Sequence, residues 1–104
     1  MANIISITNQ NGKLVVSSRE VARNFEKEHK HVLDSIDSLV EGVAEKSADL
    51  FISSVYQHKQ NKQVYREYLL TRDGFTLLAM GFSGKKALDW KLKYIEAFNK
   101  IEET

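Results

Sequence analysis

The sequence predicts a small α+β domain, and three observations lead to this class. Two pairs of short segments rich in β-branched and aromatic residues each flank a polar turn, which is typical of β-hairpins. Each pair is followed by segments whose apolar residues recur at helical spacing. The chain has 104 residues, enough for one modest core. We therefore expect one domain over residues 1–104, with the element order β-β-α-α-β-β-α-α.

The first hairpin is predicted at the N-terminus. Residues 4–8 are rich in β-branched side chains and form the first expected strand, and residues 13–16 form the second. Between them, Asn11 and Gly12 make an Asn-Gly pair, which is a strong signal for a two-residue hairpin turn.

Two helices are predicted next, separated by a short polar break. Ser17 and Glu20 have the spacing of a capping box, so the first helix should begin there and run to about Lys27. The second covers about 30–43, with its apolar residues inside an arc of roughly 120°. Two helices joined by a turn of about four residues are compatible with a helix-turn-helix. Residues 41–49 are polar and are expected to form a loop.

A second hairpin and two more helices complete the expected domain. The strands should lie at 50–56 and 63–70, on either side of a basic tip at 58–62. Helices follow at about 72–80 and 85–102. A helix-turn-helix followed by a hairpin is the layout of a winged helix, here with a long C-terminal helix.

The residues that could support catalysis or bind a metal have simpler explanations. Ser17 and Ser18 lack the glycine setting of a nucleophile elbow. His29 and His31 are two residues apart, which does not place two imidazoles on one helical face. The chain has no Cys, so a thiolate zinc site is excluded. We expect no catalytic residues, no metal ligands, no cofactor and no enzymatic activity.

No segment has the features of a membrane protein. No apolar run approaches the ~20 residues that span a bilayer, and the first residues do not resemble a signal peptide. We expect no membrane partner.

The formal net charge of +1 conceals segregated charges. Basic residues gather on the first helix and at the hairpin tip, with an acidic block between them, and clustered cations of this kind hold phosphates. The candidate DNA-contacting residues are Ser18, Arg19, Arg23, Lys27, Lys30, His31, Lys59, Lys62 and Arg66. An ordinary mixed surface is the alternative.

The second helix fits poorly as a major-groove reader. Its outward residues should be His31, Asp34, Ser35, Ser38 and Glu41, which are mostly neutral or acidic. We expect only its first turn, with Lys30 and His31, to approach DNA, and the wing to provide much of the phosphate contact.

The last helix carries apolar residues over roughly 220° of its surface, more than the 100–140° that one packed face needs. Trp90 and Tyr94 should face the core of the same chain, because they bring the larger buried area. Leu88, Leu92 and Ile95 should then form a homodimer interface. The alternative is that the first hairpin and the helix at 72–80 cover the whole arc.

The chain also resembles a known family, the phage regulatory proteins called Rha. Two motifs carry most of the resemblance, Tyr68-Leu69-Leu70-Thr71-Arg72-Asp73-Gly74-Phe75 and Met80-Gly81-Phe82-Ser83-Gly84-Lys85-Lys86-Ala87. Further matching positions are Ser18-Arg19, Val21-Ala22, His29, Val32-Leu33, Ile36, Phe51, Tyr56, Tyr94-Ile95 and Phe98-Asn99. Two departures are the pair Asp34-Ser35, where a more basic pair is expected, and the end of the chain at Thr104, where family members often continue into a further domain.

The resemblance implies a function in the cytoplasm of the bacterial host. Rha proteins are regarded as phage regulators, and their domain often forms the N-terminal part of antirepressors. They look akin to the viral KilA-N and BRO-N DNA-binding domains. We expect a DNA-binding transcriptional regulator with double-stranded DNA as its partner. The alternative is an antirepressor module that binds a repressor protein.

Overall fold

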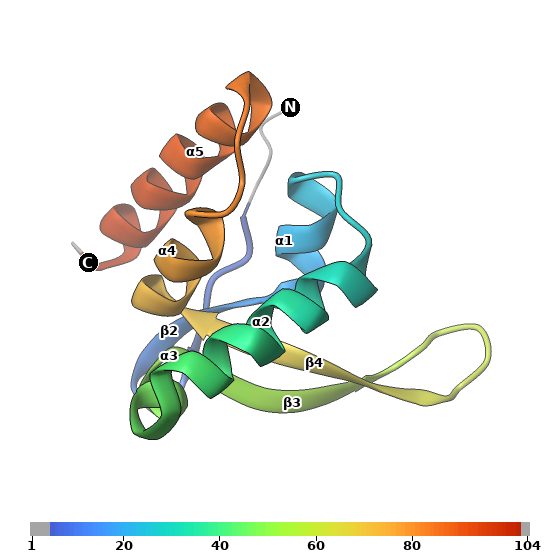
Figure 1. The fold of residues 1–104 in the computed structure, drawn as a ribbon. Helices are drawn as coiled ribbons and strands as arrows, with labels where there is room; N and C mark the ends of the chain where they lie inside the picture. The colour runs from blue at the N-terminus through green and yellow to red at the C-terminus, as the bar shows by residue number, and fades with distance from the viewer. Residues whose placement is uncertain (1–4, 103–104) are drawn as a thin grey trace.

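The computed structural model describes residues 5–102 and confirms an α+β architecture (Figure 1). Its elements are β1 (Thr8–Gln10), β2 (Lys13–Ser17), α1 (Ser18–Asn24), α2 (His29–Val43), the 3-10 helix η1 (Ala44–Lys46), α3 (Ser47–Leu50), β3 (Phe51–Gln57), β4 (Val64–Thr71), α4 (Arg72–Ala79) and α5 (Lys85–Glu102). The strands form one antiparallel sheet in the order β1-β2-β4-β3. We call the hairpin of β3 and β4, with the tip between them, the wing.

The N-terminal hairpin turns where the sequence predicts. Asn11 and Gly12 both have positive φ, 53° and 89°, as a two-residue turn of the favoured hand requires. The strand expected at 4–8 is wrong in position, because β1 begins only at Thr8 and residue 4 lies outside the described residues. Ile5 and Ile7 pack against the core instead.

The start of α1 follows only half of the predicted capping box. Ser17 caps the helix by accepting a hydrogen bond from the Arg19 N–H at 3.0 Å. The buried Glu20 carboxylate does not reach back to Ser17 and accepts the Ser6 N–H at 2.9 Å. α1 ends at Asn24, earlier than predicted, because Glu26 adopts a left-handed φ of 56°.

The prediction of a loop at 41–49 is also wrong. α2 continues to Val43, and η1 and α3 follow with almost no irregular chain between them. Ala44, with a φ of 49°, ends α2 and redirects the chain. The segment lacks an apolar stripe because its helices are short and mostly exposed. Leu50, at the end of α3, is the residue that packs against the core.

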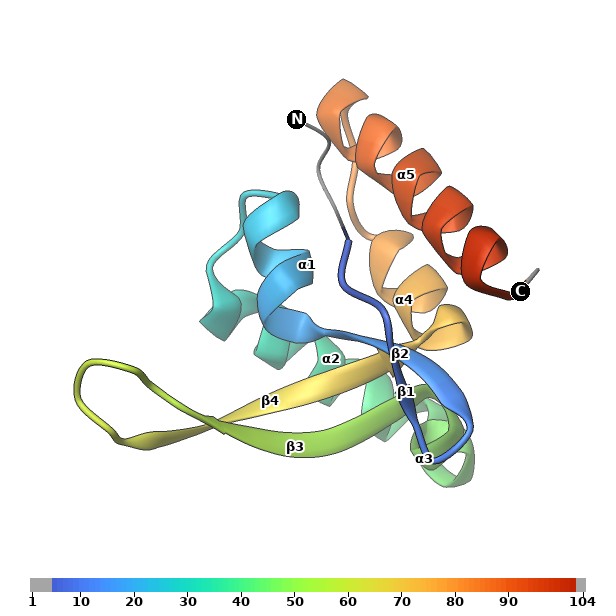
Figure 2. The same ribbon diagram turned by 180° about the vertical axis from the view of Figure 1, so that it is seen from behind.

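The wing confirms the predicted second hairpin and projects from the domain. Its register runs from Phe51 opposite Leu70 to Gln57 opposite Val64. The His58 N–H closes the tip by donating to the Gln63 carbonyl at 2.9 Å. The outer half of the wing extends beyond the helices in both ribbon views (Figures 1 and 2).

The core lies between the sheet and the helices and is rich in aromatic rings. Phe75 of α4 stacks on Tyr94 of α5, with ring centroids 4.3 Å apart and planes at 8°. Phe25 packs against Phe75 and Phe82 at 6.0 and 4.7 Å. Tyr94 is fully buried, and burial raises the pKa of its phenol. The expectation that Tyr94 faces the protein's own core is thus confirmed.

Gly74 is required where α4 crosses α3. Thr71 caps α4 by accepting the Gly74 N–H at 3.2 Å, as a residue at this position can. Gly74 is buried, and a Cβ there would overlap the Leu50 carbonyl oxygen. The backbones of α3 and α4 therefore approach more closely than any other residue would allow.

We predict that Gly74→Ala lowers the free energy of unfolding by about 1–3 kcal/mol, because the added methyl must displace backbone. The matched control is Gly42→Ala, which adds the same methyl to α2 where nothing lies within 4 Å. That change should raise the free energy of unfolding by about 0.5–1 kcal/mol, because Ala has a higher helix propensity than Gly. Urea denaturation of both variants decides the matter, and equal stabilities would contradict the close approach.

Candidate nucleic-acid interface

One buried serine joins the wing to the first turns of both α1 and α2. Ser18 Oγ accepts the Tyr68 N–H of β4 at 3.0 Å and lies 2.8 Å from His29 Nε2. Because the Tyr68 N–H occupies one lone pair, the hydroxyl proton is available to a neutral His29. Burial lowers the pKa of His29, and the charge of Arg19 acts in the same direction, so the neutral imidazole is favoured.

Aromatic rings follow one face of the wing from α2 to the tip. The ring centroid of Tyr56 lies 6.3 Å from that of His29 and 5.9 Å from that of Tyr65. His58, at the tip, meets Tyr65 edge-on at 6.2 Å. The Arg19 guanidinium lies 3.8 Å above the centroid of the Tyr56 ring. The first turn of α1 is therefore in contact with β3.

A largely enclosed carboxylate lies at the base of this arrangement. Glu67 accepts hydrogen bonds from Ser17 Oγ at 2.8 Å and from Ser54 Oγ at 3.3 Å. Its side chain is 10% exposed and lies 4.0 Å from the Arg19 guanidinium. Glu67 thus holds the cation of α1 over the wing.

A second charged pair ties the middle of α2 to β4. Arg66 donates two hydrogen bonds to the Asp37 carboxylate, at 3.1 and 2.6 Å, and the Tyr68 hydroxyl donates a third at 2.9 Å. The bond from Arg66 lowers the pKa of Asp37 and raises that of Arg66. The charge of Arg66 is therefore already matched within the domain.

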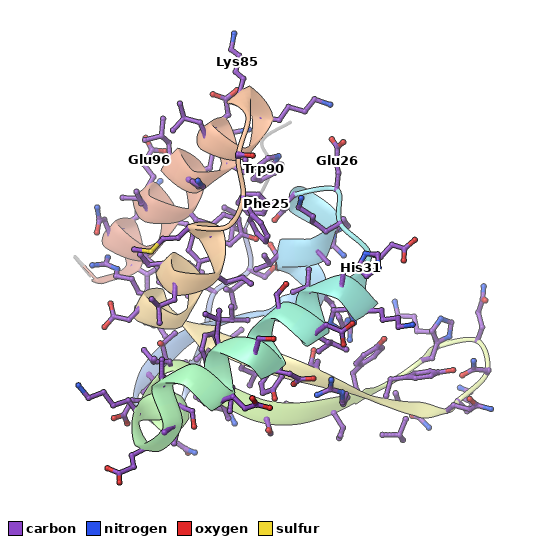
Figure 3. The ribbon with its side chains drawn as sticks, in the orientation of Figure 1. Phe25, Glu26, His31, Lys85, Trp90 and Glu96 are labelled. Carbon is purple, nitrogen blue, oxygen red and sulfur yellow. The ribbon has the colours of Figure 1, made fainter. Side chains whose placement is uncertain are left out.

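Five of the predicted DNA-contacting residues have exposed side chains near the wing. Figure 3 labels His31 at the first turn of α2, at the end of the helix that faces the wing. Lys30 precedes it, and Arg19 lies on Tyr56. Lys59 and Lys62 occupy the tip. These residues come from three segments that the fold brings together.

The other predicted contacts lie elsewhere or are occupied. Ser18 is fully buried and positions the wing, so the expectation of a DNA contact is corrected. Arg66 is paired with Asp37. Arg23 is exposed in the last turn of α1, which runs away from the wing (Figure 1). The Lys27 ammonium lies 5.2 Å from the Phe82 ring centroid, so Lys27 belongs with the connection between α4 and α5.

The tyrosine pair of the wing was not predicted from the sequence. Tyr56 and Tyr65 are directly opposed across β3 and β4. A signal existed, since the two residues lie at equal distances from the centre of the polar tip at 58–63. The contribution of His29 had no local signal, because its partners lie on α1 and β3.

Within residues 5–102, no group of three or more His, Asp or Glu side chains could hold a metal ion. No helix of that part of the chain is both long and apolar enough to cross a bilayer.

Comparison with known families gives the class of the protein. The model of the family described as "Phage regulatory protein Rha" matches residues 16–103. The chain therefore belongs to the Rha family of phage regulatory proteins. No solved structure matches the chain.

Three relatives show how this domain recurs. The "SPbeta prophage-derived putative antirepressor protein YoqD" of Bacillus subtilis is 30% identical over 99% of this chain and 42% of its own length. An uncharacterized protein of Haemophilus influenzae is 30% identical over 91% of this chain and 56% of its own. An uncharacterized 22.8 kDa protein of Salmonella phage P22 is 31% identical over 89% of this chain and 47% of its own length. The chain thus spans about half the length of the curated relatives it matches.

The pair of Asp37 and Arg66 predicts a pH-dependent contribution to stability. Because the folded pKa of Asp37 is lowered from its usual 3.8, the contribution is fully present above that value and is lost as the pH falls through the folded pKa. At pH 7, Asp37→Asn should lower the free energy of unfolding by about 0.5–1 kcal/mol, since both groups are partly exposed.

The difference between Asp37→Asn and the wild type should shrink as the pH falls below 3.8, and urea denaturation across a pH series measures it. Asp34→Asn is the control, because Asp34 is exposed one turn earlier and its side chain makes no hydrogen bond or ion pair within the described residues. A pH-independent difference would mean that the ion pair does not contribute.

Proposed function

We propose that this domain binds double-stranded DNA and acts as a transcriptional regulator of a phage or prophage. The observation that carries the proposal is the convergence of exposed cations from three segments around the wing. Arg19 comes from α1, Lys30 and His31 from the first turn of α2, and Lys59 and Lys62 from the tip. Such clusters bind the phosphate backbone through Coulomb attraction and counterion release.

The charges of α2 limit how the domain would approach DNA. Asp34 and Glu41 are exposed on the outer face of α2, so phosphates would repel that face. The first turn is more favourable, since the helix dipole adds positive potential to Lys30 and His31. Glu28 offsets part of this positive potential, because its carboxylate lies 4.0 Å from the His31 imidazole. We infer that DNA meets the wing and the start of α2, in a winged-helix manner.

We also propose a binding role without catalysis or a cofactor. His29 and Asp37 have shifted pKa values, which in many proteins mark catalytic groups. In this domain each has a structural cause, burial beside Arg19 for His29 and the bond from Arg66 for Asp37. Both groups hold the wing in place, which supports a scaffold for binding. The site of action would be the cytoplasm of the bacterial host.

A second candidate is an antirepressor module that binds a repressor protein. The observation in its favour is the apolar face of α5, where Leu88, Leu92 and Ile95 are 55%, 56% and 54% exposed. Met80, which follows α4 directly, is 73% exposed, lies beside this face and lines a groove of about 150 Å³ with Ile95. We propose that a second copy of the chain covers this face in a homodimer. A repressor protein is the alternative occupant.

The DNA proposal predicts the effect of removing both tip cations. Lys59→Ala with Lys62→Ala should weaken binding to random duplex DNA and lower the slope of log K against log salt by about 2, since each phosphate contact contributes about 0.9. The loss should be similar for all sequences, because phosphate contacts carry little sequence information. Fluorescence anisotropy across a salt series measures the slope.

The matched control removes two lysines at the start of α5, Lys85→Ala with Lys86→Ala. Lys85 lies at the far end of the domain from the wing (Figure 3), and Lys86 is paired with Glu26. This control should leave the slope within about 0.5 of the wild type. The proposed function fails if the protein binds no duplex at low salt. It also fails if the control variant loses as much affinity and salt dependence as the tip variant.

The homodimer proposal predicts a dimer in sedimentation at micromolar concentration. Leu92→Glu should give a folded monomer, because it places a charge in the proposed interface at an exposed position. Val64→Glu on the wing, where the side chain is 61% exposed, is the control and should stay dimeric. A monomeric wild type would contradict the homodimer proposal, and a repressor protein would then be the proposed partner of the apolar face of α5.

A further inference from the structure

We propose that the rings along the wing bind unpaired bases, so that the domain prefers DNA with an opened region to fully paired duplex. The ring row consists of His29, Tyr56, Tyr65 and His58. The inference rests on the proposed DNA binding and names the form of DNA that the same surface would select. Aromatic rings beside a basic groove are the common means of holding an unpaired strand.

The spacing of the ring row suits an extended strand. Successive ring centroids are 6.3, 5.9 and 6.2 Å apart. Bases stacked in B-DNA rise about 3.4 Å per nucleotide, so a paired and stacked strand could not match the rings one by one. An unpaired strand whose bases are pulled apart can instead place one base on the exposed Tyr65 ring and another on the guanidinium that covers Tyr56.

Tyr65 is held in place while its ring remains accessible. Its hydroxyl accepts a hydrogen bond from Asn61 Nδ2 at 3.1 Å and donates one to Gln63 Oε1 at 3.0 Å. The residue is nevertheless 38% exposed. A ring that is fixed before binding loses little conformational entropy when a base stacks on it.

Arg19 extends the row with a second flat surface. Its guanidinium lies 3.8 Å above the Tyr56 ring centroid and 4.0 Å from Glu67, yet its side chain is 44% exposed. A guanidinium fixed in this way can stack on a base with its outer face and attract the adjacent phosphate. Glu67 repels a strand little, because its side chain is only 10% exposed and both its oxygens accept hydrogen bonds.

Cations lie near both ends of the row, where they can attract the phosphates of a bound strand. Arg19 lies at the inner end, and Lys59 and Lys62 are exposed at the tip. A cross-strand tyrosine pair can also serve only to stabilise a hairpin. That role needs neither accessible rings nor cations at both ends of the row, so selectivity for unpaired bases distinguishes the two.

The test compares two DNA molecules of one sequence, a fully paired duplex and a duplex with a central run of mismatches that contains 2-aminopurine. We expect wild-type protein to bind the opened duplex about 10-fold more tightly, since stacking on one aromatic ring has about this effect. Aminopurine fluorescence should fall on binding as the base stacks. Tyr65→Leu should remove most of the preference and the fluorescence change, with its affinity for paired duplex within about 2-fold.

Two further variants make the test independent of folding. Val64→Ala is the matched control, since Val64 is the neighbour of Tyr65 on the other face of β4 and is 61% exposed. It should behave as the wild type. Arg19→Lys keeps the charge but not the flat surface, and should reduce the preference in the same direction as Tyr65→Leu.

Equal affinity of wild-type protein for the two molecules, or a preference that survives both Tyr65→Leu and Arg19→Lys, would overturn the inference and leave DNA binding intact. The absence of binding to either molecule at low salt would overturn the proposed function, and this inference with it.

Discussion

The hydrogen bonds of Ser18 are the constraint on which the rest of the candidate interface depends. The chain leaves the sheet at Ser17 and turns into α1, so the next position on the edge of β4 has no strand beside it. The Ser18 hydroxyl satisfies the Tyr68 N–H there, and it also meets His29 at the start of α2. Without this hydroxyl, a buried backbone donor would lose its partner at a cost of about 1–3 kcal/mol. The junction therefore fixes two helices and the wing relative to one another.

The other contacts of the wing build outward from that junction. Glu67 and Tyr56 hold Arg19, and Asp37 holds Arg66, so both arginines near the base of the wing are positioned by partners. The exposed lysines of the tip are not fixed in this way. Charge is therefore ordered where the wing meets the helices and adaptable at its end, an arrangement that suits contact with a polyanion of variable shape.

Local chemistry explains which parts of the fold were predictable. The Asn11-Gly12 turn and the cap at Ser17 depend on neighbouring residues, and the sequence indicated both of them. Glu20, Ser18 and Arg66 found partners 14, 50 and 29 residues away, which no local pattern reveals. The polar helices after Val43 lacked an apolar stripe and were mistaken for a loop. The sequence therefore indicated the cationic residues of the candidate site but did not indicate its row of aromatic rings.

The place of β3 at the outside of the sheet has a consequence for the behaviour of the protein at high concentration. An outer strand leaves alternate backbone N–H and C=O groups without a neighbouring strand, and such a row can recruit a strand from another molecule. Val55, at the middle of β3, is 64% exposed and would favour that recruitment. Charged substitutions on this strand are consequently a means of keeping the domain in solution during concentration or storage, because like-charged edges repel one another.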